Sequence, residues 1–343
     1  MKNSLLVYKA NGRKKNMGDY IQSLAAEQFT GRDVVYIERE HLHVYTGEQV
    51  KMIMNGWFMH FPENWPPTPN ITPLFVSFHV NPKKADALFT EEAIAYFKKH
   101  APIGCRDRGT EKLFLSKGIP AYFTGCLTLT LGLTYKNSPK NEDVCFVDPH
   151  FETSKNPFSL LTYLFTLLAN FKTISQISAK LNGATTIKQL LRTASFFQTY
   201  SKCFDTAVLR DGHYVKHMVV ESTLGDEEAK LNYSRNLLQK YSEAKLVVTS
   251  RIHAALPCLA MDTPVLFITS DYLNSSRKPI SQGRFDGLIE LFNVMEYSKF
   301  KLKPILGFQL KQKVKFGDLI PNKQQHLSIV EDLKQRCSSF ISN

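Results

Sequence analysis

The sequence predicts an α/β protein with parallel sheets, divided into two domains. The prediction comes from a repeated unit of apolar strand, polar loop and helix, and from the length of 343 residues. Repeated units of this kind give parallel sheets with helices on both faces. Domains usually contain about 100–200 residues. We therefore expect one domain over residues 1–138 and another over residues 139–343.

The first domain contains two such units. In the first unit we expect a strand at residues 4–8, a polar loop at 11–19, a helix at 20–29 and a strand at 33–37. Two more strands are expected at 51–54 and 74–80, with a proline-rich loop at 62–73 between them. In the second unit we expect a strand at residues 102–105, a loop at 106–109, a helix at 110–117 that ends before Gly118, and a strand at 121–124.

The second domain contains the clearest unit. The β-branched run KLVVT (residues 245–249) is typical of a buried parallel strand. We expect a turn at 250–253, a helix at 254–261 and a strand at 263–268. A polar stretch at 135–143 precedes this domain, whose first strand is expected at 144–147. A C-terminal helix, residues 325–340, is expected to pack back onto the first domain.

The charge balance predicts acidic partners. The chain has 43 Lys and Arg against 31 Asp and Glu, a formal net charge of +12. Phosphorylated metabolites, nucleic acid and an anionic membrane surface all fit such a charge. The chain has no RNA- or DNA-binding motif, so we do not expect nucleic acid as a partner.

Cysteine usage and hydropathy favour a cytoplasmic protein. The six cysteines form no C-x-x-C pair and lie in apolar runs, so we expect buried free thiols in a reducing compartment. Residues 4–8 are too short for a signal-peptide core. The longest apolar run, residues 158–171, falls short of the roughly 20 residues that a membrane span needs.

Three polar segments follow predicted strands, at residues 16–19, 106–108 and 250–253. In open parallel sheets, ligands bind beyond the carboxyl ends of the strands, where helix N-termini offer free N–H groups. We therefore expect these segments to face one cleft between the two domains.

The segment at residues 250–253 contains Arg251 and His253. Arginine can hold a carboxylate or phosphate through a forked pair of hydrogen bonds, and histidine is suited to proton transfer near neutral pH. With Ile252 pointing inward, both side chains would share the open side of the turn. The structural alternative is an arginine that caps neighbouring strand ends and a histidine that packs.

The other two segments each allow two interpretations. Arg106 and its neighbours form either a surface ion-pair cluster or an anion site, and Asp107 either orients an arginine or caps the following helix. Asp19 is either a helix N-cap or a base that takes a proton from a sugar hydroxyl. Gly18 would allow close approach of the backbone to a ligand.

Several familiar sites are absent from the sequence. It contains no G-x-G-x-x-G, no G-x-x-x-x-G-K-[ST], no H-E-x-x-H and no G-x-S-x-G. A dinucleotide site, a Walker loop and a catalytic metal site are therefore not expected, and we expect no metal or cofactor.

Three motifs, in this order, resemble the polysaccharide pyruvyl transferase family. They are N-M-G-D-Y-I-Q-S-L-A (residues 16–25), I-G-C-R-D-R-G-T-E-K-L (residues 103–113) with G-I-P-A-Y-F-T-G-C-L-T-L-T-L (residues 118–131), and V-V-T-S-R-I-H-A-A-L-P-C-L-A-M-D-T-P-V (residues 247–265). The resemblance implies two Rossmann-like domains in a GT-B-like arrangement. The active site would lie in the interdomain cleft, with the acceptor on the first domain and the donor on the second.

The resemblance also implies a reaction. Phosphoenolpyruvate would be the donor, two hydroxyls of one sugar the acceptors, and a cyclic pyruvate ketal and phosphate the products. In this scheme His253 is the acid and Asp19 is the base. The donor would be bound by Arg251, Arg106 and Ser250. The acceptor would be bound by Asn16, Gly18 and Trp57. Where the family often has a glycine-rich segment, this chain reads M-N-G-W-F (residues 54–58), so Trp57 either stacks on a sugar or belongs to the core.

Residues 153–204 contain six Lys or Arg and no Asp or Glu. Together with the apolar run at 158–171, this composition fits an amphipathic surface on anionic lipid, where a lipid-linked acceptor at the inner face of the membrane would lie. It also fits a helical insertion packed on the second domain.

Two other functions remain open at this point. One is a GT-B glycosyltransferase that uses a nucleotide sugar. The other is a non-catalytic protein that binds an anion or a sugar.

Overall fold

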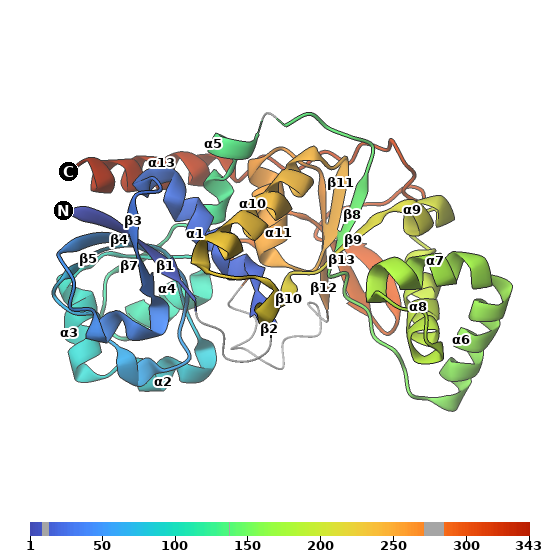
Figure 1. Ribbon diagram of the computed structural model, residues 1–343, viewed down its shortest axis with the longest axis horizontal. Coiled ribbons are helices and arrows are strands. Elements are labelled where there is room, and N and C mark those ends of the chain that lie inside the picture. Colours follow the sequence, from blue (N-terminus) through green and yellow to red (C-terminus); the bar gives the residue numbers. More distant parts are fainter. Residues whose placement is uncertain (9–13, 137, 271–284) are drawn as a thin grey trace.

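The computed structural model describes residues 1–8, 14–136, 138–270 and 285–343 (Figure 1). Part of the loop predicted at 11–19, namely residues 11–13, and residue 137 of the polar stretch at 135–143 lie outside the described residues. Two sheets dominated by parallel pairing, with helices packed around them, confirm the predicted α/β class.

The first sheet is six-stranded, and each neighbouring pair in it is parallel. Its order is β3 (Val34–Glu38), β1 (Lys2–Val7), β4 (Val50–Phe58), β5 (Ile71–Val80), β6 (Ile103–Cys105) and β7 (Ala121–Phe123). Strand β4 runs four residues beyond its predicted end at Met54, because a bulge between Met54 and Gly56 lets pairing with β5 continue. Gly56 adopts a φ of 121°, a conformation that favours glycine.

The second sheet is also six-stranded, and its one antiparallel pair is β13 with β14. Its order is β14 (Lys301–Ile305), β13 (Asn293–Ser298), β12 (Val265–Ser270), β11 (Leu246–Thr249), β8 (Val144–Val147) and β9 (His213–Val215). The first sheet ends at Phe123 and the second begins at Val144, on either side of the predicted division at residue 138.

The helices of the first half begin with α1 (Met17–Thr30), which follows β1. After β5 come α2 (Ala85–Leu88), α3 (Glu91–Lys99), α4 (Arg108–Ser116), the 3-10 helix η4 (Leu127–Thr130) and α5 (Gly132–Tyr135). Gly118 follows the C-cap of α4 with a φ of 68°, as predicted.

The polar segments predicted as loops include the first turns of helices. Helix α1 begins at Met17 and α4 at Arg108, and in the second half α11 (Ile252–Ala260) begins within the predicted turn. Asn16, rather than Asp19, is the N-cap of α1, because its side chain accepts a hydrogen bond from the Gly18 N–H. Asp107 caps α4 by accepting from Thr110 N, in agreement with one of the two predicted roles.

Between β8 and β9 the chain forms four helices, α6 (Pro157–Ala169), α7 (Phe171–Asn182), α8 (Ile187–Tyr200) and α9 (Thr206–Asp211). We call residues 153–204 the helical insertion. It projects from the end of the second sheet that is farthest from the first sheet (Figure 1). Its buried side chains join those of β8, β11 and β12 in a second hydrophobic cluster.

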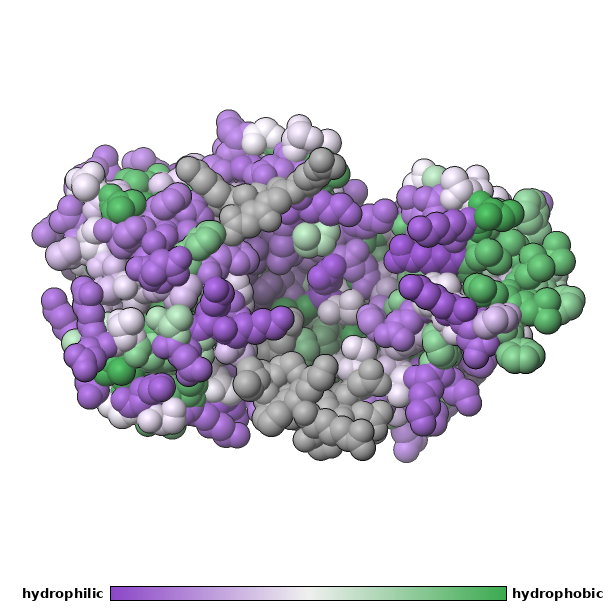
Figure 2. Space-filling model, turned by 90° about the horizontal axis from the view of Figure 1, so that it is seen from below, coloured by the Kyte–Doolittle hydropathy of each residue, from purple (hydrophilic) through white to green (hydrophobic). Residues whose placement is uncertain are grey.

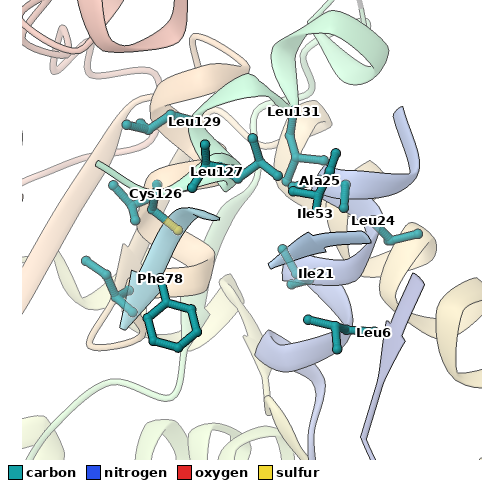
Figure 3. Close-up of a cluster of buried hydrophobic side chains, with 14 of the residues drawn as sticks. Leu6, Ile21, Leu24, Ala25, Ile53, Phe78, Cys126, Leu127, Leu129 and Leu131 are labelled. Carbon is teal, nitrogen blue, oxygen red and sulfur yellow. The ribbon is translucent and has the colours of Figure 1, made fainter. Parts of the chain in front are cut away.

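A continuous hydrophobic core joins the two sheets through α1, η4, α11 and α10 (Glu227–Glu243), which lie between them (Figure 1). Figure 3 shows part of this core, where Ala25 of α1 lies beside Leu131, just beyond η4. A two-stranded antiparallel pair, β2 (Lys14–Asn16) with β10 (Met218–Val220), adds a backbone link between the halves.

The C-terminal helix α13 (Leu327–Ser342) packs against the first sheet. The Arg336 guanidinium lies 4.6 Å from the centre of the Tyr122 ring in β7. Lys51 Nζ, in β4, donates a hydrogen bond to the Ile341 carbonyl at 3.1 Å. Leu333 and Cys337 are the buried residues of this helix. All six cysteines are free and buried, as predicted.

Candidate functional site

Each sheet has a point at which its strand order reverses. From β1 the chain crosses to β3 on one side and then to β4 on the other, and from β8 it crosses to β9 and later to β11 on the opposite side. Ligands in open α/β sheets bind beyond the carboxyl ends of the strands at such switch points. Ligand-binding residues are therefore expected at the two switch points, β1/β4 and β8/β11.

The N-terminus of α1 lies at the first switch point. Asn16 Oδ1 accepts from Gly18 N at 3.1 Å, and Met17 N donates to the His217 carbonyl at 2.9 Å. Asp19 is half-buried in the first turn. Burial raises the pKa of its carboxyl, whereas the nearby charge of Arg39 opposes that rise. A carboxylate with a raised pKa is a better proton acceptor than an ordinary surface aspartate.

The N-terminus of α11 lies at the second switch point. Arg251 Nε donates to Asp148 Oδ2 at 2.7 Å, and Ser250 Oγ donates to the Asp148 carbonyl at 2.7 Å. Asp148 directly follows β8 and adopts a φ of 40°. Because the Arg251 side chain is 40% exposed, the pair contributes at most about 1 kcal/mol to stability. Its main effect is to orient the guanidinium.

Gly18 and His253 bring the two helix N-termini together. A Cβ placed on Gly18 would lie 3.2 Å from both Cβ and Nδ1 of His253. Glycine therefore lets the imidazole sit directly against the first turn of α1, at a distance that a larger residue would crowd. The first and third sequence motifs meet here, although 234 residues lie between Gly18 and His253 in the chain.

A pocket of about 280 Å³ opens beside Arg251. Its polar lining includes Asp148, His150, Arg192, Lys216, Ser250 and Arg251. Arg192 comes from the helical insertion, whereas Lys216 follows β9. Three cationic side chains around one small pocket favour a compact anion. The expectation that Arg251 and His253 share the open side of the turn is wrong. His253 does not line the pocket, because it turns towards α1 while Arg251 turns towards Asp148.

Arg106 directly follows β6 of the first sheet and is almost fully buried. This burial rules out the surface ion-pair interpretation for Arg106. Its Nη2 lies 3.3 Å from Asp107 Oδ2, which also lies 2.6 Å from His79 Nδ1. Burial raises the pKa of Asp107, but His79 and Arg106 outweigh it and hold that pKa at about 2. Arg108, in contrast, is an exposed partner of Glu111.

A polar corner lies between β1 and β4, beside Asp19. A Cβ on Gly56 would lie 3.1 Å from Tyr8 Oη and 3.6 Å from Gln22 Oε1. Gln22 Oε1 and Asn55 Oδ1 are buried and accept no hydrogen bond from the described residues. A side chain at position 56 would crowd Tyr8 Oη, so glycine lets these polar groups pack against β4.

Trp57 is half-buried at the same edge of the sheet. The Arg39 guanidinium lies 4.9 Å from its ring centre, and Arg39 Nη1 donates to the Trp57 carbonyl at 2.9 Å. The His60 ring packs edge-on at 4.6 Å. Trp57 is therefore held by its neighbours and is only in part a core residue.

Sequence reasoning missed Asp148, Tyr8, Gln22 and Lys15. A strand followed by Asp is a signal that could have identified Asp148, since the residue lies directly after the VCFV strand. Lys15 gave no signal, because a lysine in a polar stretch normally lies in water. Here it is buried beside Tyr20, and burial lowers its pKa to about 8.

Over the part of the chain that the structure describes, no group of three His, Cys, Asp or Glu side chains is arranged to hold a metal ion. Comparison with known proteins gave one result. A family model described as polysaccharide pyruvyl transferase matches residues 16–272, more than half of the chain. No curated protein and no solved structure matches this chain significantly.

Proposed function

The chain belongs to the polysaccharide pyruvyl transferase family, and on this premise we propose that it transfers a pyruvyl group from phosphoenolpyruvate onto two hydroxyls of a sugar. The observation that carries the proposal is the meeting of Gly18 and His253, which joins the helix N-termini at the two switch points. Helix N-termini favour anions, and phosphoenolpyruvate carries a carboxylate and a phosphate.

The donor binds at the α11 side of this junction. Arg251, already oriented by Asp148, holds the carboxylate or the phosphate in forked geometry, and Ser250 contributes a hydroxyl. Lys216 and Arg192 supply further positive charge along the pocket. Arg106 acts at longer range, because its charge is shared with Asp107.

His253 and Asp19 then move the protons. In this proposal the methylene end of the donor extends from the Arg251 pocket to the contact between α11 and α1, where His253 protonates its methylene carbon and leaves an oxocarbenium-like centre at the adjacent carbon. The first sugar hydroxyl forms a bond to that centre and gives its proton to Asp19. The bond to the phosphate oxygen breaks and phosphate leaves with its electron pair. The second hydroxyl forms the remaining carbon–oxygen bond and gives its proton to the deprotonated His253, which closes the ketal and restores the acid.

The acceptor sugar binds at the polar corner between β1 and β4. Asn16 and Gly18 lie on the α1 side of this region, and the part of the half-buried Trp57 ring that Arg39 and His60 leave uncovered is where a sugar would pack. The buried oxygens of Gln22 and Asn55 retain unused acceptor capacity, and a sugar hydroxyl would reach them once this corner opens. We place the acceptor on a lipid carrier at the inner face of the membrane, because the basic helical insertion borders the donor pocket.

The test is an activity assay with phosphoenolpyruvate and a panel of oligosaccharides. We expect release of phosphate that depends on the acceptor, together with a product whose NMR spectrum contains the methyl signal of a pyruvate ketal. His253→Gln should lower the rate by about 10²–10⁴-fold, which is the usual contribution of a positioned acid or base. Its affinity for phosphoenolpyruvate should remain within a few-fold of the wild-type value, because Arg251 is intact.

Lys245→Gln is a suitable control, since this lysine pairs with Glu142 away from both switch points. Its rate should equal that of the wild type. Phosphate release that leaves every acceptor unmodified would contradict pyruvyl transfer. A His253→Gln enzyme as fast as the control would remove His253 from the mechanism.

A further inference from the structure

We propose that the outer face of helix α6 docks on an anionic lipid bilayer. This face consists of large apolar side chains that are between 43% and 81% exposed: Phe158, Leu161, Leu164, Phe165 and Leu168. We call it the α6 outer face. Phe171, at the start of α7, extends it and is also exposed. Figure 2 shows hydrophobic side chains gathered at this end of the molecule.

The α6 outer face exists because α6 is apolar over most of its surface, broken only by a stripe of Ser159, Thr162 and Thr166, of which the two threonines donate to backbone carbonyls of the same helix. The buried residues of α6 are Tyr163 and Leu167, which are one turn apart and join the second hydrophobic cluster. Leu161, Phe165 and Leu168 follow at helical spacing on the opposite side. The helix contains no charged residue. A helix whose large apolar side chains extend well beyond its buried side is normally covered by protein or by lipid.

The length of α6 limits how lipid can enclose it. Its 13 residues correspond to about 20 Å at 1.5 Å per residue, against a hydrocarbon core of roughly 30 Å. Within the described ranges, no helix combines the length and apolar character of a membrane-spanning segment. The helix therefore lies in the plane of the bilayer surface, as amphipathic anchoring helices do.

The charges around α6 select an anionic surface. The helical insertion has six Lys or Arg and no Asp or Glu. Lys155 precedes α6 and Lys172 follows it, and both are exposed. Lys180 does not contribute, because its Nζ donates to the Arg210 and Asp211 carbonyls. Basic residues that flank a buried apolar face add attraction to anionic lipid headgroups.

The same charges argue against a second copy of this chain. Two such faces in contact would bring two uniformly basic segments together, and like charges at an interface are unfavourable. An anionic bilayer supplies both an apolar interior and compensating charge. We therefore assign the α6 outer face to lipid.

Docking through α6 would also orient the donor pocket. Arg192, Leu181 and Asn182 of the helical insertion line that pocket, so the insertion connects the bilayer surface with Arg251. The docking surface itself shares no residue with the proposed catalytic site. Its test is therefore independent of the proposed reaction.

The test is flotation of the purified full chain with vesicles of phosphatidylcholine alone and of phosphatidylcholine with phosphatidylglycerol. The wild type should float with the anionic vesicles, and at least tenfold less with the neutral ones. Phe165→Ser/Leu168→Ser should lower flotation with anionic vesicles at least tenfold. Leu133→Ser/Leu319→Ser, which changes two leucines of similar exposure elsewhere, should leave it unchanged.

Several results would overturn the proposal. These are failure of the wild type to float with anionic vesicles, equal flotation of wild type and α6 variant, and equal loss in both double variants. A concentration-dependent dimer that is present in the wild type and absent from the α6 variant would assign the face to a second copy instead. Circular dichroism spectra that superimpose for all three proteins would exclude misfolding as the cause of a loss.

Discussion

Helices α11 and α6 are similar in composition and opposite in environment. In α11, every residue from Ile252 to Leu259 is buried between the two sheets. In α6, which is at least as apolar, most of the large side chains face outward. Helix α11 carries the Arg251 and His253 motif at its N-terminus, whereas α6 contributes no residue to the pocket or the junction.

The difference shows that composition and topology determine different things. Apolar composition predicts that a helix will be shielded from water, whereas the topology of the chain determines which elements shield it. Helix α11 connects two central strands, β11 and β12, so the sheet and α1 cover it. Helix α6 lies in a long connection between β8 and the edge strand β9, and the chain beyond it supplies cover for one side alone.

The largest effect should come from truncating one leucine in each helix. Leu256→Ala in α11 should lower the free energy of unfolding by about 2–5 kcal/mol, because Leu256 is fully buried and its removal leaves a cavity. Leu168→Ala in α6 should change it by less than about 0.5 kcal/mol in the absence of lipid. Urea unfolding monitored by circular dichroism measures both values. Similar losses in both variants would show that the α6 outer face is covered within the protein.

A smaller effect should appear on acidification, through His217 at the buried junction. Burial lowers the pKa of His217 to about 4, from an ordinary value of about 6.5. Between these values the unfolded chain binds a proton that the folded chain does not, so stability falls as the pH falls from about 6.5 to about 4. The full loss is about 3 kcal/mol at 1.36 kcal/mol per pH unit.

His217→Gln should flatten this pH dependence of the free energy of unfolding. His213→Gln, which changes an exposed histidine on β9, should leave it as in the wild type. The expectation fails if the His217 variant loses as much stability on acidification as the wild type does.

The next effect concerns the contact between α1 and α11. Gly18→Ala places a Cβ 3.2 Å from His253, so the imidazole must move by a few tenths of an ångström. We expect turnover to fall about tenfold, because small displacements of a reacting group are costly. Stability should change by no more than about 1 kcal/mol, since the helix propensity of alanine offsets the crowding.

The matched control is Gly31→Ala at the other end of α1. Gly31 has open space around it but a φ of 77°, so alanine there strains the backbone without touching the site. This variant should lose stability and keep its turnover. A Gly18→Ala enzyme with wild-type turnover would show that its contact with His253 has no catalytic role.

Much of the fold was predictable because strand–helix repeats are local patterns. The strand at 144–147 and the helix closed by Gly118 lie where the sequence placed them. Helix starts were placed too late, because Asn16 caps α1 from outside the apolar pattern. The helical insertion could be recognised by its charge, but its exposed face could not, since exposure depends on which strands its ends connect.

The candidate site was predictable only in part. The three motifs identified Gly18, Arg106, Arg251 and His253, but their spacing did not indicate which of them would meet. The contact of Gly18 with His253 depends on packing between the two halves of the chain. Asp148 escaped notice because its role depends on the adjacency of β8 and β11, which are about 100 residues apart in sequence.

The measurement that tests the account most directly is a thermal-shift titration of the wild type and of Arg251→Ala. It would compare phosphoenolpyruvate with UDP- and GDP-sugars. At a hundred times the dissociation constant, a ligand stabilises the fold by about 2.7 kcal/mol. We predict such a shift with phosphoenolpyruvate alone and its loss in Arg251→Ala. A shift with a nucleotide sugar and none with phosphoenolpyruvate would contradict pyruvyl transfer and favour glycosyl transfer.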